Sequence, residues 1–397
     1  MKTHIVKITP QLYLLRLDDD KTRYFEAIWE IPEGITYNSY LLLGQDKNIL
    51  FDTWKHTYTQ QFIETLSQVI SPRDIDQIIV HHMEQDHSGA LPKILEEAGN
   101  KPEIIGHPLT NRMIQAFYGI KPKFKDIKDG ETISTGDKTI KIIHTPWLHW
   151  PETIMSYIIE DNVLLTCDAF GGYSIPPTIF DKPSIVEEYL PHVRKYIVTV
   201  IGNYLKHIPK AVEKLQSLEI KPKIIAPSHG LIFKNNPETI IKFYLETASG
   251  KPEDKTVIIY STMYGEIGEA INQIIKELEN KQKKYAVFRY DDKNQPSIAE
   301  ALSETINAKT IIIGVATYEA DVFPTINYIT DLIIKKIPKN KQILIVSSYG
   351  WGKTAGRKLS QKLSQAGFKI IDTIEFHGKP KETEVNKIKE VMEKITQ

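Results

Sequence analysis

The chain has 397 residues, and its 50 basic and 50 acidic side chains give a formal net charge of zero. This balance argues against a protein that coats nucleic acid or anionic lipid, and the length favours two domains of roughly 150 residues or more. The single cysteine, Cys167, excludes an internal disulfide bond and any iron–sulfur, rubredoxin or zinc-ribbon site built from this chain alone. No apolar run has the form of a signal peptide or a membrane span, so we expect a cytoplasmic protein without nucleic-acid or membrane partners.

In the first half, short apolar strands lead directly into loops that contain Asp or His. We expect these strands at residues 48–51, 77–80, 162–165 and 223–226. The most charged loop, residues 81–87 with the sequence HHMEQDH, follows the second of them, and an apolar helix is predicted to begin near Ser88. Loops at strand ends are where proteins commonly place polar chemistry, so this half is the candidate for a reactive site.

The side chains of this loop suggest a metal site. Clustered charges repel one another unless a cation or hydrogen bonds compensate them, and imidazole with carboxylate suits borderline divalent metals. A solvated polar turn is the alternative interpretation. Three later loops at strand ends offer matching groups, His149, Asp168 and His229, and they favour the metal.

Seven side chains in this order and spacing resemble the diiron ligands of the flavodiiron proteins: His82, Glu84, Asp86, His87, His149, Asp168 and His229. In that family the N-terminal domain has the metallo-β-lactamase αββα fold. The resemblance implies that His82, Glu84 and His149 hold one iron, that Asp86, His87 and His229 hold the other, and that Asp168 bridges them. His81 and His144 match no ligand position, and we interpret both as supporting side chains.

Glu84 bears on the choice of metal. Zinc hydrolases of the same fold usually have a second His at this position. A carboxylate there makes the site more negative and favours iron that changes oxidation state over a zinc pair. A zinc metallohydrolase fused to an inert flavodoxin-like module is therefore the less favoured alternative.

The second half is predicted to be a doubly wound α/β domain. A polar segment, residues 248–255, has the composition of a linker, which gives a diiron domain over residues 1–247 and a second domain over 256–397. Strands are expected at residues 256–260, 285–290, 309–313, 342–347 and 368–374, alternating with helices. The first of these helices carries an apolar stripe with a period of 3.6 residues from Ile267 to Leu278, as packing on a parallel sheet requires.

Three loops of this half resemble the FMN-binding loops of the flavodoxin-like domain of the same family. They contain neither a Walker A motif nor GxGxxG. The FMN contacts that the resemblance implies are Ser261, Thr262, Met263, Tyr264, Gly265, Ile267, Ala316, Thr317, Tyr318, Ser348, Tyr349, Gly350, Trp351 and Gly352. Glu266 and Ile267 stand where the usual phosphate loop has hydroxyl side chains, so we expect weaker FMN binding. An α/β domain without flavin is the alternative.

The family resemblance implies an oxidoreductase in which FMN passes electrons to two irons and O2 is reduced to water. Residues 25–34 look most like methanogen members that oxidise reduced coenzyme F420, which makes F420H2 the expected donor. A nitric oxide reductase and a rubredoxin-fed oxidase are alternatives with the same ligands. The resemblance also implies a head-to-tail homodimer, or a dimer of such dimers, in which each FMN faces the partner's irons.

Overall fold

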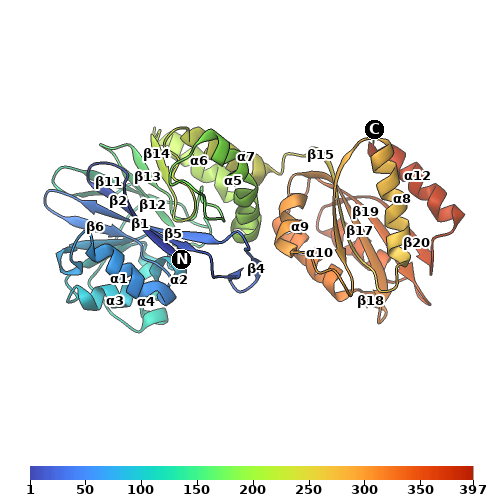
Figure 1. The fold of residues 1–397 in the computed structure, drawn as a ribbon, viewed down its shortest axis with the longest axis horizontal. Helices are drawn as coiled ribbons and strands as arrows, with labels where there is room; N and C mark the ends of the chain where they lie inside the picture. The colour runs from blue at the N-terminus through green and yellow to red at the C-terminus, as the bar shows by residue number, and fades with distance from the viewer. Residues whose placement is uncertain (397) are drawn as a thin grey trace. The chain divides into compact units, whose positions relative to one another are not determined.

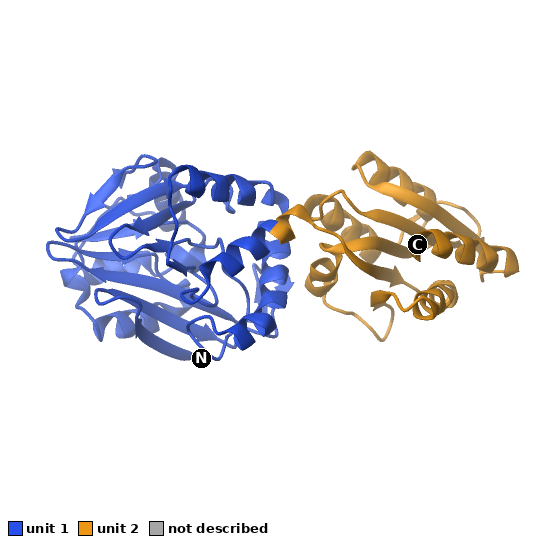
Figure 2. Ribbon diagram, turned by 90° about the horizontal axis from the view of Figure 1, so that it is seen from above, with its two compact units in different colours: residues 1–245 blue, residues 246–397 orange. Residues whose placement is uncertain are grey.

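The computed structural model describes residues 1–396. The chain folds into two compact units that divide between Leu245 and Glu246 (Figure 2). Helix α7 (Pro237–Ser249) and strand β15 (Glu253–Ser261) both extend into the segment predicted as a linker, which leaves only residues 250–252 without regular structure. The charged start of β15 joins the sheet because Glu253 pairs with Ala308.

The first unit contains two sheets. Its strands are β1 (Lys2–Lys7), β2 (Leu12–Asp19), β3 (Tyr24–Phe25), β4 (Trp29–Glu30), β5 (Ile35–Leu43), β6 (Asn48–Phe51), β7 (Gln77–Val80), β8 (Glu103–Gly106), β9 (Phe124–Asp126), β10 (Thr132–Ser134), β11 (Thr139–His144), β12 (Ile154–Ile158), β13 (Val163–Leu165) and β14 (Ile224–Ala226). One sheet has the order β1-β2-β5-β6-β7-β8-β9 and the other β10-β11-β12-β13-β14, while β3 and β4 form a separate hairpin.

The core of this unit lies between the two sheets. Alternate residues point inward along each strand, as Leu12 and Leu14 do on β2 and Ile140 and Ile142 do on β11, and all four are buried in one apolar cluster. This period of two is what a sheet buried on one face requires. The strand ends, and the loops that follow them, are thereby held in fixed positions.

Helices cover the outer faces of these sheets. They are α1 (Thr59–Ser67), α2 (Gln85–Ser88), α3 (Leu91–Glu97), α4 (Pro108–Tyr118), α5 (Pro183–Tyr196), α6 (His207–Ser217) and α7. Figure 1 shows α1, α3 and α4 together on one side of the unit and α5, α6 and α7 on the other. The arrangement is the predicted αββα sandwich.

The helix expected near Ser88 differs from the prediction. A short helix, α2, begins at Gln85 and ends at Ser88, and α3 starts separately at Leu91. The break occurs because the loop after β6 binds this segment: the Thr53 amide donates to the His87 carbonyl, and the Ala90 amide donates to the Trp54 carbonyl. Asp86 and His87 therefore lie on a helical turn.

The second unit is the predicted doubly wound domain. Besides β15, its strands are β16 (Lys284–Tyr290), β17 (Ala308–Tyr318), β18 (Asp321–Val322), β19 (Gln342–Tyr349) and β20 (Lys369–His377), and its helices are α8 (Glu266–Asn280), α9 (Ile298–Thr305), α10 (Pro324–Lys336), α11 (Ala355–Gln365) and α12 (Glu382–Thr396). The parallel strands have the order β16-β15-β17-β19-β20, so the chain reverses direction beside β15. Ligands of such folds bind at this reversal, outside the carboxyl ends of the strands.

The apolar stripe of α8 packs as predicted. Ile267, Ile271, Ile274 and Leu278 are buried in one cluster with residues of the sheet and of α12. Figure 1 shows α9 and α10 on the opposite face of this sheet. Strand β17 is longer than expected, because residues 314–318, predicted to form a loop, continue the strand.

Within residues 1–396, no helix combines the length and the apolar character needed to cross a membrane.

Candidate metal centre and cofactor cavity

The seven predicted metal ligands lie in segments that follow strands of the first unit. His82 and Glu84 follow β7, and Asp86 and His87 lie on α2. The other three come from the loops after β11, β13 and β14, namely His149, Asp168 and His229. Six of the seven residues are buried, and Glu84 is partly buried. The structure thus brings together side chains that are up to 147 positions apart in the sequence (229 − 82).

These side chains form two groups that could each hold a metal ion. His82, Glu84, His149 and Asp168 make up the first, and Asp86, His87 and His229 make up the second; within each group the potential ligand atoms lie within 4.8 Å of one another. A third set, Asp52, His87 and Cys167, meets the same distance limit and shares His87 with the second group. The first two groups match the division that the family resemblance implies.

Asp168 reaches both groups with its two carboxylate oxygens. Its Oδ2 atom lies 3.6 Å from His82 Nε2 and 3.5 Å from His149 Nε2. Its Oδ1 atom lies 3.1 Å from His87 Nε2 and 3.3 Å from His229 Nε2. One oxygen toward each group is the placement that a carboxylate bridging two metal ions needs.

Several atoms of this cluster are buried without a hydrogen-bond partner among the described residues. They are both carboxylate oxygens of Asp86 and the Nε2 atoms of His87, His149 and His229. Some of them lie close to an opposite charge, as His149 Nε2 does at 2.9 Å from Glu84 Oε2, but not in hydrogen-bond geometry. Burying polar atoms without hydrogen bonds costs free energy, and native structures rarely do so without compensation. All five atoms are good metal ligands, so two divalent cations fit the arrangement.

The electrostatics of the cluster also suit cations. Burial opposes protonation of His82, but hydrogen bonds to Glu152 and Glu84 outweigh it and raise its pKa to about 10. For His229, contacts with Asp168 and Asp86 likewise overcome burial and raise the pKa to about 9. Without metal, protons on the imidazoles therefore balance the carboxylates, and metal binding would displace those protons.

Three supporting contacts were missed by the sequence analysis. Glu152 Oε1 lies 2.8 Å from His82 Nδ1, and the Tyr196 hydroxyl donates to Asp168 Oδ1 at 2.7 Å. His229 Nδ1 lies 2.6 Å from the carbonyl oxygen of Thr36. Each supporting residue is far from its ligand in the sequence, so no local spacing of residues identifies these contacts.

The two histidines that match no ligand position lie outside both groups. His81 is buried with Nδ1 2.7 Å from Asp52 Oδ2 and Nε2 2.8 Å from Ser156 Oγ. His144 Nε2 lies 3.0 Å from the Ile127 carbonyl oxygen. Hydrogen bonds to protein groups, and not metal ligation, account for both side chains.

A small cavity of about 190 Å³ opens onto the metal centre. Glu84 and Asp86 line it together with the hairpin residues Phe25, Glu26 and Ala27. The ring of Phe25 lies 6.0 Å from the ring of His229. A cavity of this volume has room for a diatomic molecule beside Glu84 and Asp86.

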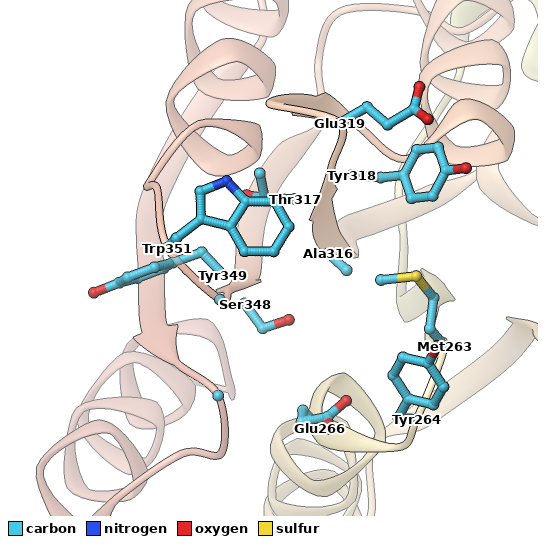
Figure 3. Close-up of a pocket in the computed structure, with 12 residues that line it drawn as sticks. Met263, Tyr264, Glu266, Ala316, Thr317, Tyr318, Glu319, Ser348, Tyr349 and Trp351 are labelled. Carbon is cyan, nitrogen blue, oxygen red and sulfur yellow. The ribbon is translucent and has the colours of Figure 1, made fainter.

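A larger cavity, of about 470 Å³, lies at the carboxyl ends of the strands in the second unit. Nine of the predicted flavin contacts line it: Met263, Tyr264, Ala316, Thr317, Tyr318, Ser348, Tyr349, Gly350 and Trp351. Figure 3 shows Tyr349 at the end of β19, and Trp351 just after it, across from Met263 and Tyr264 of the loop between β15 and α8. Tyr264 and Trp351 are each 87% exposed, and a flat ring bound between these loops would cover their apolar faces.

The other five predicted contacts do not line this cavity. Ser261 and Ile267 are buried, and Ile267 belongs to the apolar core under α8. Thr262 and Gly265 shape the loop, because Thr262 Oγ1 accepts from the Gly265 amide at 2.9 Å. Gly352 also lies outside the lining. Conversely, Glu266, Glu319 and Gly378 line the cavity although the sequence analysis did not place them among the contacts.

The start of α8 is suited to a phosphate group. Gly265 occupies the cap position with φ +106° and provides no side chain to cap the helix. The first amides of the helix are thus available to an anion, which the helix dipole also favours. Glu266, the first helical residue, places a negative charge beside this position.

Replacing Glu266 by glutamine is therefore expected to tighten FMN binding. Removing a like charge near the phosphate is worth about 0.3–1 kcal/mol at a helix end, or a decrease of roughly two- to fivefold in the dissociation constant. Fluorescence titration of the flavin-free protein with FMN measures this dissociation constant. Glu269→Gln is the matched control, because Glu269 lies in the same first turn but outside the cavity lining and pairs with Lys379. Equal or weaker binding by Glu266→Gln would contradict the expectation.

Comparisons with known proteins agree with this architecture. Residues 35–230 match the family described as ODP family beta lactamase, and residues 258–390 match the flavodoxin family. A mutant of the flavo di-iron protein from Thermotoga maritima has 39% sequence identity, with a TM-score of 0.94 over 100% of this chain and 99% of that chain. Rubredoxin oxygen:oxidoreductase from Desulfovibrio gigas has 26% identity, with a TM-score of 0.93 over 99% and 98% of the two chains.

A nitric oxide reductase from Moorella thermoacetica is 28% identical over 92% of this chain and 91% of its own length. The flavodoxin domain and the two carboxylate–imidazole groups make FMN and a pair of iron ions the cofactors. Because the likeness to the Thermotoga maritima protein extends over both units, this chain belongs to the flavodiiron proteins, a family of oxidoreductases.

Proposed function

We propose that this protein reduces O2 to water with four electrons, taken from reduced coenzyme F420 by FMN and passed to the diiron centre. The observation that carries the proposal is the position of Asp168, which directs one oxygen toward each ligand group. Two metal ions that share one carboxylate can each change oxidation state, which suits the multi-electron reduction of a diatomic molecule. The choice of reduced coenzyme F420 as the electron donor rests on the resemblance of residues 25–34 to methanogen members of the family.

The ligand roles follow the two groups. His82, Glu84 and His149 would hold one iron. Asp86, His87 and His229 would hold the other, with Asp168 between them. When bound, the irons supply the reducing electrons and the positions at which a diatomic substrate coordinates.

The protein residues around this centre orient the ligands and limit access. Tyr196 donates a hydrogen bond to Asp168 and so fixes the carboxylate that faces both groups. Glu152 does the same for His82. The hairpin residue Phe25 lines the cavity of about 190 Å³ beside Glu84 and Asp86, which has room for O2 or NO.

In the second unit, we propose that FMN occupies the cavity of about 470 Å³. The first amides of α8 would bind its phosphate, and the end of β17 at Tyr318 and the loop that carries Trp351 would border its ring. Thr262, Gly265 and Ser261 would act by shaping the phosphate loop. A head-to-tail homodimer, as the family resemblance implies, would bring each flavin to the partner's irons.

Two other activities use the same residues. Nitric oxide reduction is favoured by the name of the Moorella thermoacetica relative, a nitric oxide reductase. Electron supply by rubredoxin is favoured by the name of the Desulfovibrio gigas protein. Both keep the diiron centre and differ only in substrate or donor.

The test is an anaerobic titration of the iron- and FMN-loaded protein with F420H2, followed by a pulse of O2. Each donor supplies two electrons, so we expect two F420H2 to be consumed for each O2. If F420H2 remains untouched while the dithionite-reduced enzyme still consumes O2, rubredoxin becomes the donor to test. Faster turnover with NO than with O2 would favour the nitric oxide reductase. Zinc without flavin in the purified protein would overturn the proposal as a whole.

A further inference from the structure

The metal-facing histidines differ in what holds their second ring nitrogen. His82 Nδ1 lies 2.8 Å from a carboxylate oxygen of Glu152, whereas His229 Nδ1 lies 2.6 Å from the Thr36 carbonyl oxygen. His87 Nδ1 is 3.9 Å from the thiol sulfur of Cys167. An imidazole that binds metal through Nε2 keeps its proton on Nδ1, and the acceptor of that proton sets how strongly the ring donates electrons. The carboxylate makes His82 the strongest donor of these three.

Glu152 is placed to act on His82. The residue is fully buried, and its Oε1 atom also accepts a hydrogen bond from the Met83 amide at 3.0 Å. Its Oε2 atom is buried without a hydrogen-bond partner among the described residues. Within residues 1–396, no lysine or arginine forms an ion pair with Glu152, and its charged partner is His82. The charge of Glu152 is therefore directed at the first ligand group.

The charges of the site explain why a buried carboxylate is tolerated there. Two ferrous ions bring four positive charges, and Glu84, Asp86 and Asp168 bring three negative ones. Glu152 supplies the fourth, so that the two ferrous ions, the three carboxylate ligands and Glu152 together are neutral. Asp52, which lies near His87, is paired with His81 Nδ1 at 2.7 Å. Oxidation of either iron adds a positive charge. A fixed negative charge such as that of Glu152 stabilises this added charge most at the iron to which it lies nearest.

We propose that Glu152 is a positioning residue that makes the iron at His82 the easier of the two to oxidise. The inference rests on the proposed diiron centre. With O2 or a titration mediator as the electron acceptor, loss of one electron from the two-ferrous state would leave the ferric ion at His82, and loss of a second would oxidise the iron at His87 and His229. The two irons have unequal reduction potentials, and the buried carboxylate contributes to the difference.

The test is a redox titration of the iron-loaded, full-length protein, with the mixed-valence state followed by electron paramagnetic resonance. Glu152→Gln keeps an oxygen acceptor and removes the charge. We expect this variant to retain two irons and to raise the lower of the two diiron potentials. If the ferric-to-ferrous ratio at a fixed potential falls tenfold, the reduction potential of this one-electron couple has risen by about 59 mV. The gap between the two potentials narrows, and the mixed-valence signal becomes weaker.

Two further variants separate the charge of Glu152 from a role in folding. Glu152→Asp keeps the charge and is expected to retain most of the gap. Asp181→Asn is the matched control, because Asp181 is an equally buried carboxylate that binds the amides of Lys234, Asn235 and Asn236 and belongs to neither ligand group. It should leave both diiron potentials unchanged.

The outcomes distinguish this inference from the proposed function. Unchanged potentials in a Glu152→Gln protein with two irons would overturn the inference and leave the diiron centre in place. Loss of iron from both Glu152→Gln and Glu152→Asp would also overturn it, because Glu152 would then only hold the ligand loop in position. Fewer than two irons in the unaltered protein would instead overturn the proposed function.

Discussion

Asp168→Asn is expected to lower O2 turnover by at least about 100-fold, the upper end of what changes around a metal site typically cost. The amide has almost the shape of the carboxylate, but it has no charge and only one oxygen. It therefore cannot present an oxygen to His82 and His149 on one side and to His87 and His229 on the other, as the carboxylate does. Iron content per chain and O2 consumption are the measurements.

FMN content provides the internal control for Asp168→Asn, because the flavin cavity is formed by residues of the second unit. We expect FMN to stay bound while iron falls below two per chain. Tyr196→Phe removes only the hydrogen bond to Asp168 Oδ1 and should have a smaller effect. Two irons and undiminished turnover in Asp168→Asn would show that the bridging role is misassigned.

The second large effect is expected for Gly230→Ala, next to His229. Gly230 has φ +82°, and an added Cβ would lie 1.7 Å from the Tyr189 hydroxyl oxygen and 2.6 Å from Cζ of the same ring. Tyr189 is buried and cannot move away freely. The backbone at this point is also held by the Gly230 amide, which donates to Thr36 Oγ1 at 2.7 Å. We expect a loss of at least about 2 kcal/mol in the free energy of unfolding and a displaced His229.

Thermal unfolding and iron content measure the effect of Gly230→Ala. Gly99→Ala is the matched control, because Gly99 also has a positive φ, +65°, but a Cβ there would meet nothing within 4 Å. Gly99→Ala should lower the free energy of unfolding by only about 1 kcal/mol, because alanine disfavours a positive φ. Adding Tyr189→Phe to Gly230→Ala removes the closest clashing atom and should restore part of the stability. A Gly230→Ala protein as stable as Gly99→Ala would refute the expected clash.

Much of the fold is predictable from the sequence because each signal is local. The stripe from Ile267 to Leu278 needs only the period of a helix, and the structure buries that face. The strands before the ligand loops are likewise short apolar runs, and the structure has them at Asn48–Phe51 and Gln77–Val80. Where polar residues occur inside a regular element, prediction failed. Strand β17 continues through Thr317 and Tyr318 because those residues pair with β18.

The candidate metal ligands could be predicted as a set, but not the contacts that orient them. Only a few residue types bind metal ions, and the loops at strand ends bring such residues together at one edge of a sheet. A supporting partner can be any polar group that packing brings near. Tyr196 lies on α5, 28 positions after Asp168, and Glu152 lies 70 positions after His82. Only the folded chain shows that these residues meet.

The unpartnered ligand atoms link the lifetime of the protein to iron supply. Asp86, His87, His149 and His229 all bury atoms that the polypeptide alone leaves without hydrogen bonds. Ions that bind only the folded chain stabilise it in proportion to the logarithm of their free concentration. When iron is scarce, we therefore expect a larger fraction of the chains to be open at any moment and exposed to proteases. A loss of one or two kcal/mol in this way is enough to change the abundance of a protein severalfold.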